Sequence, residues 1–489
     1  MIRGVVHSIL EDTPEGVSRR LATSPRASAL VEIRADALRA GDVSGLVQRA
    51  GRPLVVAVRS LEDGGSFDGS TEEKKTILGA ALGAGSAFVD VEWDGPLRAQ
   101  AFGPWASRTI LSHHGAACDA STLNPLFDEM SQTKASRLKI VPRATRPTDL
   151  GAIRDLLARA RDARRELCAF ALGRTGAWSR VVALSWGSWG VYGAAARGRA
   201  TGEGQFETRE LLEVYRVTEI SDATRLFGLC WTPLAGSPSP ELHAAGYREL
   251  GLDAVYVPVD TDDIDAFASI VSGDALLPLA GFGVTIPLKE RVAERCVKKD
   301  AFANCGAVNT VCVAAGRWEG FNTDAPAAMA LIRKHLDPSG SVAAIVGAGG
   351  TARALASALK EAGASVTLYA RNAARGDTAA RAIGGASAPL SALPGERWDL
   401  LVQATPAGKN GEEVLLRRHL DGRMVLDAAY GAEPTPLVLA ARARGLAVVD
   451  GFDLLAVQAV LQFERLSGRP APKDAMAAAL QSWQSRSPA

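Results

Sequence analysis

A lysine in the first half of the chain stands where a reactive amine would be expected. Lys139 lies between Leu138 and Ile140 in an otherwise apolar run, and only 11 of the chain's 55 basic residues are lysines. A lysine in such a strand either extends its ammonium to solvent from the edge of the core or is held as an amine nucleophile. The residue type alone leaves both interpretations open.

Further polar side chains stand at the ends of neighbouring apolar runs. They are Glu32, Arg34, Arg59, Glu92 and His113. A histidine that titrates near neutrality can move a proton, and an arginine can bind a carboxylate through two parallel N–H groups. One such residue would indicate a solvated strand end, but their recurrence at consecutive runs favours a single polar site.

The second half of the chain contains a glycine motif of the kind that binds a pyrophosphate. The apolar run 341–346 is followed by Gly347-Ala348-Gly349-Gly350-Thr351-Ala352, which opens a predicted helix. Free backbone N–H groups there can hold a dinucleotide, although glycines in a tight turn can also serve packing. The next run, 365–369, leads into Arg371 and Arg375 instead of an acidic residue. These arginines favour the 2′-phosphate of NADP, the alternative being charge at the start of a solvated helix.

Short β-branched runs alternate with helix-like stretches through the first 190 residues. The predicted strands are Gly4–Leu10, Ala29–Arg34, Leu54–Arg59, Phe88–Glu92, Thr109–His113, Leu138–Val141, Leu167–Leu172 and Val181–Trp186. Between them, segments such as 149–164 place their apolar residues on one helical face. Eight such units favour a (β/α)8 TIM barrel with 206–217 as its last outer helix, the rival being an open doubly wound sheet. In a barrel, the polar strand ends would meet at one mouth, where catalytic groups belong.

Length, charge and cysteine content exclude several other classes of protein. The 489 residues suggest about two to four domains, and a net charge of +1 argues against a nucleic-acid partner or a polybasic membrane contact. We find no apolar run long enough for a membrane span and no signal peptide before Glu11. The six cysteines form no C-x-x-C pair and the six histidines lack ligand spacing. We therefore expect no disulfide scaffold, no metal and a soluble cytoplasmic protein.

The α/β alternation restarts after a boundary near residues 218–224. Leu226–Cys230 predicts a new strand, a helix follows at 241–251, and a further strand is predicted at 254–258. No long linker separates the two halves, which we therefore expect to fold as consecutive α/β domains.

Seven segments of the first half occur in the order of one known family. They are Glu32-Ile33-Arg34-Ala35-Asp36, Val58-Arg59-Ser60, Val89-Asp90-Val91-Glu92, Ser112-His113, Leu138-Lys139-Ile140-Val141-Pro142, Gly176-Ala177-Trp178-Ser179-Arg180 and Gly204-Gln205. Together they resemble the type I 3-dehydroquinate dehydratases, which are Schiff-base enzymes built on a (β/α)8 barrel.

This resemblance implies a role for each polar residue. Lys139 would form an imine with the ring ketone of dehydroquinate, and His113 would remove the adjacent C2 proton and later protonate the departing hydroxyl. Glu92 would hold the imidazole in orientation. The implied substrate-binding residues are Glu32, Arg34, Arg59, Arg180 and Gln205.

The histidine segment departs from the pattern of that family. The family usually places Asp or Asn after its histidine, whereas His114 and Gly115 follow His113 here. Since adjacent strand residues point to opposite faces, only one histidine can face the mouth. We expect His113 to face it and His114 to lie behind the strand.

Five segments of the second half follow a different family. They are Gly236-Ser237-Pro238-Ser239-Pro240, Gly283-Val284-Thr285-Ile286-Pro287-Leu288-Lys289, Gly306-Ala307-Val308-Asn309-Thr310, Gly320-Phe321-Asn322-Thr323-Asp324 and Gly451-Phe452-Asp453-Leu454-Leu455-Ala456-Val457-Gln458. They resemble the shikimate dehydrogenases, with a two-lobed α/β fold and a Rossmann-like NADP-binding domain.

The second resemblance implies a catalytic pair, Lys289 and Asp324, beside the transferring hydride. The implied substrate-binding residues are Ser237, Ser239, Thr285, Asn309 and Gln458. The expected cofactor-binding residues are Gly347, Gly349, Gly350, Thr351, Ala352, Arg371, Arg375, Thr405, Tyr430 and Gly451. The cofactor half departs from the family at Ala370, Asn372, Gln403 and Lys409, which affects NADP selectivity and nicotinamide packing rather than the chemistry.

The sequence thus predicts two consecutive reactions in one chain: dehydration of 3-dehydroquinate, then NADPH-dependent reduction of 3-dehydroshikimate to shikimate. The expected domains are a barrel at 1–219, a substrate lobe at 225–337 completed by 453–489, and an NADP lobe at 338–452. Two alternatives stay open, namely a non-catalytic barrel serving as a scaffold and a dehydrogenase that prefers quinate and NAD. Small molecules are the expected partners, and the sequence leaves the oligomeric state and channelling of the intermediate open.

Overall fold

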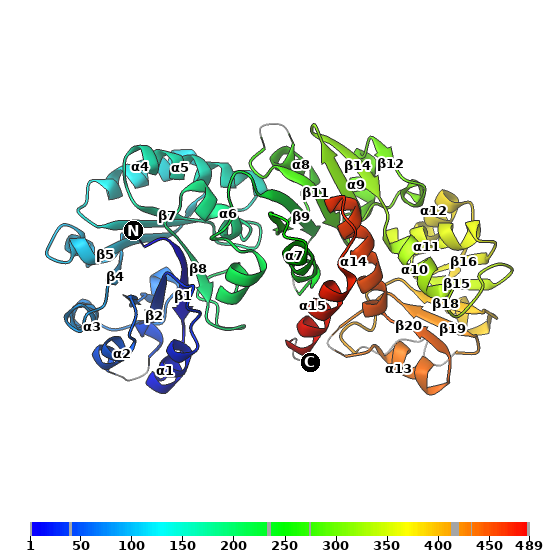
Figure 1. The fold of residues 1–489 in the computed structure, drawn as a ribbon, viewed down its shortest axis with the longest axis horizontal. Helices are drawn as coiled ribbons and strands as arrows, with labels where there is room; N and C mark the ends of the chain where they lie inside the picture. Colours follow the sequence, from blue (N-terminus) through cyan, green and yellow to red (C-terminus); the bar gives the residue numbers. More distant parts are fainter. Residues whose placement is uncertain are drawn as a thin grey trace. The chain divides into compact units, whose positions relative to one another are not determined.

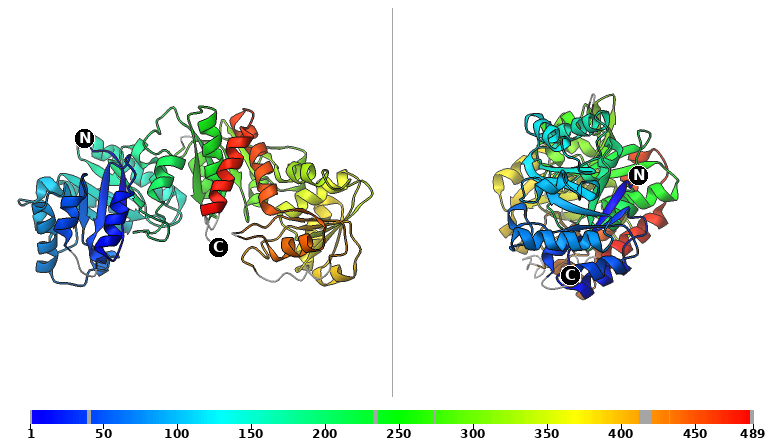
Figure 2. Two further views of the ribbon diagram at one scale, coloured as in Figure 1. Left: turned by 60° about the horizontal axis from the view of Figure 1, so that its bottom comes forward. Right: turned by 90° about the vertical axis from the view of Figure 1, so that its left-hand side faces the viewer.

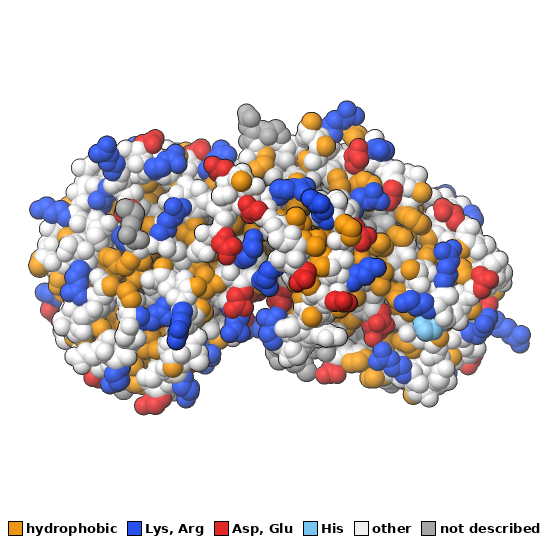
Figure 3. Space-filling model, viewed as in Figure 1, with side chains coloured by type: hydrophobic (Ala, Val, Ile, Leu, Met, Phe, Trp, Pro, Cys, Tyr) orange, Lys and Arg blue, Asp and Glu red, His pale blue; other side chains and the backbone are white. Residues whose placement is uncertain are grey.

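The computed structural model describes residues 2–38, 42–231, 236–272, 275–411, 420–431 and 433–486 (Figure 1). The chain divides into two compact units, each described here by itself. The first comprises Met1–Thr224 with Val257–Leu277, and the second comprises Arg225–Tyr256 with Pro278–Ala489. No helix of the described residues is long and apolar enough to cross a membrane. On the face shown in Figure 3, basic and acidic side chains are interspersed, in keeping with the net charge of +1.

The first unit contains a curled, all-parallel sheet of eight strands. The strands are β1 (Gly4–Ile9), β2 (Leu30–Arg34), β3 (Leu54–Ala57), β4 (Phe88–Glu92), β5 (Thr109–Ala117), β6 (Arg137–Arg143), β7 (Leu167–Ala169) and β8 (Gly190–Ala194). Their order is β7-β6-β5-β4-β3-β2-β1-β8. The outermost strands, β7 and β8, come together where Trp189 donates its backbone N–H to Leu167 O at 3.1 Å. The sheet is thus a nearly closed barrel, which confirms the predicted fold class.

Helices cover the outside of this sheet (Figure 1). They are α1 (Pro14–Ala22), α2 (Val43–Arg49), α3 (Thr71–Gly83), α4 (Ala120–Ser131), α5 (Leu150–Asp162) and α6 (Ser179–Trp186). Helix α3 begins with a capping box in which Ser70 and Glu73 bond each other's backbone N–H groups. Helix α5 buries the predicted apolar face, formed by Leu150, Ile153, Leu156, Leu157 and Ala160.

The predicted position of the eighth strand is wrong. Val181–Trp186 lies within helix α6, which the left-handed Gly187 ends at φ 112°. The strand is instead Gly190–Ala194, whose glycine and alanine content hides it from a pattern based on β-branched residues. Gly193 is required there, because a Cβ would lie 2.7 Å from Thr208 Cα. The helix predicted at 206–217 is reduced to a short π-helix, Glu210–Val214.

The second unit contains a parallel sheet and most of a mixed sheet. The mixed sheet has the order β10-β9-β11-β13-β14-β12, and the parallel sheet has the order β17-β16-β15-β18-β19-β20. The strands of the mixed sheet are β9 (Arg225–Trp231), β10 (Ala254–Asp260), β11 (Leu279–Val284), β12 (Lys298–Lys299), β13 (Thr310–Ala314) and β14 (Arg317–Phe321). Those of the parallel sheet are β15 (Val342–Val346), β16 (Ser365–Ala370), β17 (Ala386–Pro389), β18 (Leu400–Gln403), β19 (Met424–Asp427) and β20 (Ala447–Val449).

The remaining helices are α7 (Ser239–Glu249), α8 (Ile264–Val271), α9 (Lys289–Arg295), α10 (Asp324–Ile332), α11 (Gly350–Glu361), α12 (Ala373–Ile383), α13 (Pro436–Ala443), α14 (Gly451–Ser467) and α15 (Lys473–Arg486). The C-terminal helix α15 lies beside α7 (Figure 2). Phe463 of α14 packs in one apolar cluster with Phe227 and Tyr247. The end of the chain therefore returns to the mixed sheet after the parallel sheet is complete.

Candidate active sites

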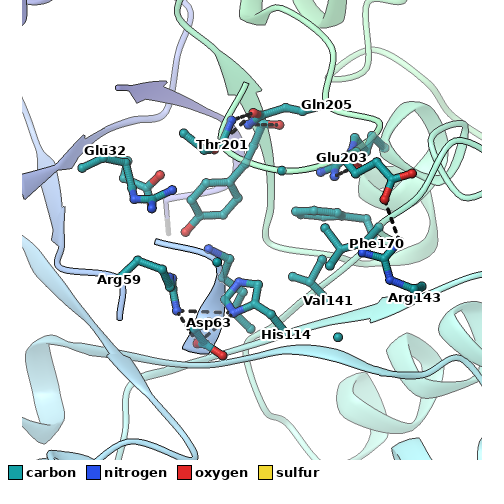
Figure 4. A pocket seen from close by; sticks show the side chains of 18 of the residues that line it. Glu32, Arg59, Asp63, His114, Val141, Arg143, Phe170, Thr201, Glu203 and Gln205 are labelled. Carbon is teal, nitrogen blue, oxygen red and sulfur yellow. Dashed lines mark hydrogen bonds and ion pairs between the residues drawn. The ribbon is translucent and has the colours of Figure 1, made fainter. Parts of the chain in front are cut away.

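A cavity of about 390 Å³ opens within the first unit, at the carboxyl ends of the barrel strands (Figure 4). Its lining includes Glu32, Arg34, Arg59, Asp63, His114, Lys139, Arg143, Phe170, Arg180, Tyr192, Thr201, Glu203 and Gln205. Active sites of barrel enzymes lie at this end of the strands. All five substrate-binding residues predicted for the first half line this cavity.

Lys139 lies at the wall of this cavity, on β6. Its Nζ lies 3.5 Å from Asp90 Oδ2 and 3.9 Å from the centroid of the Tyr192 ring. The side chain is 6% exposed, so the amine is screened from bulk water yet open to the cavity. This placement fits an amine nucleophile and is not that of a snorkelling lysine.

The predicted orientation of the two histidines is wrong, because His114 and not His113 lines the cavity. Ser112 and His114 alternate onto the same side of β5, and both accept hydrogen bonds from Arg59 Nη1, at 3.0 Å and 3.3 Å. His113 points to the other side and pairs with Asp94 through Nδ1 at 2.7 Å. The polar Ser112, two residues before His114, is the sequence signal that could have indicated the register.

The surroundings of His114 keep its imidazole neutral. Its pKa is well below 6.5, first because the ring is buried and then because the Arg59 and Lys139 cations lie close by. Asp63 Oδ2 lies 3.7 Å from Nδ1 of the ring (Figure 4). A neutral imidazole can accept a proton, and the nearby carboxylate would stabilise the imidazolium that forms.

Glu92 does not make the predicted contact with the imidazole. Its carboxylate accepts hydrogen bonds from the Ser60 backbone N–H and Oγ, both at 2.8 Å, and from Lys74 Nζ. It is absent from the cavity lining. Sequence reasoning chose the acid on the strand and missed Asp63, which follows Arg59 by four residues on a short 3-10 helix, η2 (Leu61–Asp63).

Arg180 provides a cationic site at one side of the cavity. Its guanidinium bonds the backbone oxygens of Gly204 and Glu203 at 3.1 Å and 3.2 Å, and no carboxylate of the described residues forms an ion pair with it. Burial lowers its pKa to about 9. An anionic ligand group would relieve this uncompensated charge, so the side chain suits a substrate carboxylate.

Another part of the cavity wall offers a hydrogen-bond acceptor. Glu32 Oε1 accepts a hydrogen bond from Ser8 Oγ at 2.5 Å, whereas the buried Oε2 has no partner. Arg34 is held by a two-pronged contact with Asp36, at 2.8 Å and 2.7 Å. Gln205 accepts hydrogen bonds from the Thr201 backbone N–H at 2.6 Å and from its hydroxyl at 3.1 Å. An unpartnered buried carboxylate oxygen is suited to a ligand hydroxyl.

A second polar cluster in the other unit centres on Lys289. Its Nζ donates to Asp324 Oδ2 at 2.5 Å and to Thr351 Oγ1 at 2.9 Å. Asn309 Nδ2 donates to the other oxygen of Asp324 at 2.8 Å. Gln458 Oε1 accepts from the Thr323 hydroxyl at 3.3 Å. The structure thus brings the predicted pair together and connects it with two predicted substrate-binding residues.

The predicted serines lie at the start of helix α7. The hydroxyl of Ser237 donates to Ser239 Oγ at 3.2 Å and accepts from the Ser239 backbone N–H at 3.3 Å. Thr285 follows β11 and is partly exposed. Hydroxyls at the positive end of a helix suit a carboxylate, which agrees with their expected role.

The residues of the glycine motif fit a pyrophosphate. Gly349 is the N-cap of α11, no side chain bonds the free N–H groups of that turn, and a Cβ on Gly349 would enter open space. Gly350 leaves little room for a side chain, because a Cβ would lie 3.1 Å from Lys289 Cβ. The start of α11 is therefore both open to a ligand and packed closely against the Lys289 side chain.

The other predicted cofactor residues surround the same end of the parallel sheet. Arg371 and Arg375 are exposed at the start of α12, which Asn372 caps. Thr405 packs against Gly347, and a Cβ on Gly347 would lie 3.1 Å from Thr405 Cγ2. Gly451 must be glycine, because a Cβ would lie 2.4 Å from Ala429 O. Burial, with the Asp324 charge, raises the pKa of Tyr430 to about 12.

Comparison with known proteins assigns each half to a family. The family model "Type I 3-dehydroquinase" matches residues 7–222, and the model "Shikimate dehydrogenase substrate binding domain" matches residues 229–311. An Arabidopsis thaliana protein named bifunctional 3-dehydroquinate dehydratase/shikimate dehydrogenase, chloroplastic, is 28% identical over 91% of this chain and 78% of its own length. The shikimate dehydrogenase (NADP(+)) of Halobacterium salinarum is 39% identical over 52% of this chain and 98% of its own.

Solved structures of similar proteins include the Thermus thermophilus shikimate 5-dehydrogenase in complex with NADP(H) and shikimate. It is 30% identical, with a TM-score of 0.48, over 53% of this chain and 100% of that one. The dehydroquinate dehydratase and shikimate dehydrogenase from S. pombe AroM is 23% identical, with a TM-score of 0.43, over 98% of both chains.

Proposed function

The chain belongs to the shikimate dehydrogenase family over its second half and carries a type I 3-dehydroquinase domain in its first, and on this premise we propose that it catalyses both reactions. The first is dehydration of 3-dehydroquinate to 3-dehydroshikimate, and the second is NADPH-dependent reduction of that product to shikimate. The observation that carries the proposal is the pair of buried, separately partnered lysines, Lys139 and Lys289.

In the first reaction, Lys139 acts as the nucleophile. Its neutral amine attacks the carbon of the ring ketone, and uptake of one proton with loss of one water leaves an iminium whose positive charge lies on the nitrogen. The iminium draws electrons from the adjacent C2–H bond and makes that proton acidic. His114, neutral because of its depressed pKa, accepts the C2 proton and then protonates the departing hydroxyl.

Other residues of the cavity bind and orient the substrate. Arg180 receives the substrate carboxylate, and the unpartnered Glu32 Oε2 receives a ring hydroxyl. Arg34 and Gln205 complete the polar wall. Arg59 and Asp63 flank His114. Arg59 donates a hydrogen bond to the neutral ring, and the Asp63 carboxylate stabilises the imidazolium.

In the second reaction, the cofactor NADPH supplies a hydride to the ketone carbon when it is bound. Lys289 protonates the carbonyl oxygen, and Asp324 orients the Lys289 side chain through their hydrogen bond. Ser237 and Ser239 bind the carboxylate at the start of α7, while Thr285, Asn309 and Gln458 bind ring hydroxyls. Gly349–Ala352 would hold the pyrophosphate of the cofactor, and Thr405, Tyr430 and Gly451 would border its nicotinamide.

The proposed domain boundaries follow these assignments. The dehydratase comprises residues 1–219, the substrate lobe comprises 225–337 with 453–489, and the NADP lobe comprises 338–452. The return of α14 to the apolar cluster of the mixed sheet supports assigning 453–489 to the substrate lobe.

The assignment of the base to His114 predicts a clear difference between two neighbouring substitutions. His114→Asn should lower the dehydratase kcat by about 10²- to 10⁴-fold, the usual contribution of a general acid–base group. His113→Asn, which removes only the exposed pair with Asp94, should change kcat less than about threefold. Initial rates of enone formation check both variants, and equal losses in the two would contradict the assignment.

Removal of the cation at Arg180 should weaken substrate binding. Arg180→Gln should reduce kcat/KM of the dehydratase by roughly 10- to 100-fold, because a charge-assisted two-pronged bond contributes about 1.5–3 kcal/mol. The matched control is Arg161→Gln, at an exposed position on α5. A binding titration with dehydroquinate measures the effect, and unchanged affinity would place the carboxylate elsewhere.

Cofactor choice should depend on the arginines after β16. Arg371→Ala with Arg375→Ala should raise the KM for NADPH by roughly 10- to 100-fold and leave the KM for NADH nearly unchanged, since only NADPH carries the 2′-phosphate. Arg381→Ala, exposed at the other end of α12, is the matched control. Equal losses with both cofactors would show that these arginines do not select NADP.

Two experiments test the proposed function against its alternatives. Borohydride reduction in the presence of dehydroquinate should leave a stable adduct on the peptide containing Lys139, and an unmodified peptide would favour a scaffolding barrel. Oxidation rates on shikimate and quinate, each with NADP and NAD, should be highest for shikimate with NADP. Faster oxidation of quinate would overturn the substrate assignment.

A further inference from the structure

Lys74 is a buried cation that the proposed mechanism does not use. It lies in helix α3, is 3% exposed, and donates hydrogen bonds to Ser60 Oγ at 2.7 Å and to Glu92 Oε2. A buried ammonium is costly unless it is paired, so Glu92 compensates its charge. The cost of burying both ions calls for a role beyond packing.

The pair holds one particular turn of the backbone. Glu92 accepts the Ser60 backbone N–H with Oε1 and the Ser60 hydroxyl with Oε2, both at 2.8 Å. Lys74 bonds the same hydroxyl, so strand β4, helix α3 and the end of β3 are joined at Ser60. Ser60 is the N-cap of the short helix η2.

This turn carries the two residues that flank His114. Arg59 immediately precedes Ser60, and Asp63 follows it by three residues. Arg59 Nη1 lies 3.2 Å from Asp63 Oδ2 and 3.3 Å from His114 Nδ1. Asp63 itself is partly exposed and lies on a single helical turn. Its position therefore depends on the contacts that Glu92 and Lys74 make with Ser60, at the start of that turn.

We propose that Lys74 and Glu92 form a positioning pair, which holds the Arg59–Asp63 turn and thereby sets the geometry of proton transfer at His114. This inference rests on the proposed dehydratase function. Neither residue of the pair lines the substrate cavity or contacts the histidine; the pair acts through Ser60 and through the ion pair of Glu92 Oε1 with Arg59 Nη1 at 3.9 Å. It also gives Glu92 a function that differs from direct contact with the imidazole.

The test separates positioning from stability with single and double substitutions. Lys74→Met removes the nearer of the two cations that pair with the buried Glu92 carboxylate and should lower both Tm and kcat. The double variant Lys74→Met/Glu92→Leu removes both charges and should recover most of the lost Tm, because apolar groups can replace a buried ion pair. Its kcat should stay about 10- to 100-fold below the original value, with KM changed less than threefold, since small displacements of reacting groups cost that much.

Three comparisons complete the design. Lys74→Arg keeps the charge and should retain kcat within about threefold. Lys75→Met is the matched control on the same helix, where the lysine is exposed and pairs with Glu72 only at 3.8 Å. The dehydratase rate of the unmodified protein tests the proposed function on its own, so its failure is distinguishable from failure of the positioning inference.

The pH profile provides a readout that a merely structural pair would not change. The charged groups around His114 are Arg59, Asp63, Asp90, Lys139 and the neighbouring His113. Arg59 lowers the pKa of His114, so displacing it should move the acid limb of the kcat profile of the double variant to higher pH. A double variant with the original kcat and pH profile would overturn the proposal.

Discussion

Lys139→Met should abolish the dehydratase reaction. Without an amine, no iminium forms and the C2 proton is not activated, so kcat should fall by roughly 10⁴-fold or more, as when other covalent nucleophiles are removed. Methionine matches the lysine in length and apolar volume, and the surrounding wall of Tyr192 and Asp90 is retained. Enone formation from dehydroquinate without NADPH measures the loss.

The control for this variant is Lys134→Met, at an exposed position just before β6. It should retain the original rate of enone formation. Intact mass after borohydride reduction should show the substrate adduct in this control and not in Lys139→Met. An adduct that persists in Lys139→Met would mean that a different lysine forms the imine.

Lys289→Met should have a comparable effect on the second reaction. The substitution removes the proton donor and the cation that stabilises the developing alkoxide, so kcat should fall by about 10³-fold. Asp324 keeps its bond to Asn309 at 2.8 Å, and binding of shikimate should therefore change much less than kcat. Absorbance of NADPH during shikimate oxidation measures the rate.

The matched control here is Lys298→Met, an exposed lysine on β12. It should oxidise shikimate at the original rate. If Lys289→Met raised KM in proportion to its loss of kcat/KM and left kcat unchanged, the lysine would be a binding residue and not the proton donor.

The sequence predicted the barrel and the parallel nucleotide-binding sheet because the alternation of apolar runs and amphipathic segments is a local pattern. Seven of the eight barrel strands lie at the expected positions, and helix α5 buries the expected face. Lys139 and the glycine motif were found for a similar reason, since each is a polar or flexible element within an apolar context.

The errors arose where the outcome depends on packing between distant segments. In the strand Gly190–Ala194, position 193 is a glycine because Thr208 approaches it closely, a contact that no local pattern records. His113 and His114 are adjacent on one strand, so their side chains point to opposite faces of the sheet. The register of the strand decides which of them faces the cavity and which faces Asp94. Glu92 binds Lys74, which lies on a helix 18 residues earlier in the chain, and does not contact the histidine.

Because both proposed active sites lie in one chain, the dehydration and the reduction can be followed together in one cuvette. Purified protein with dehydroquinate alone should produce the enone absorbance of 3-dehydroshikimate, and later addition of NADPH should consume that enone together with NADPH in equal amounts. This result would show both reactions in one chain and in the proposed order. Absence of enone before NADPH, or enone that NADPH does not consume, would contradict the account.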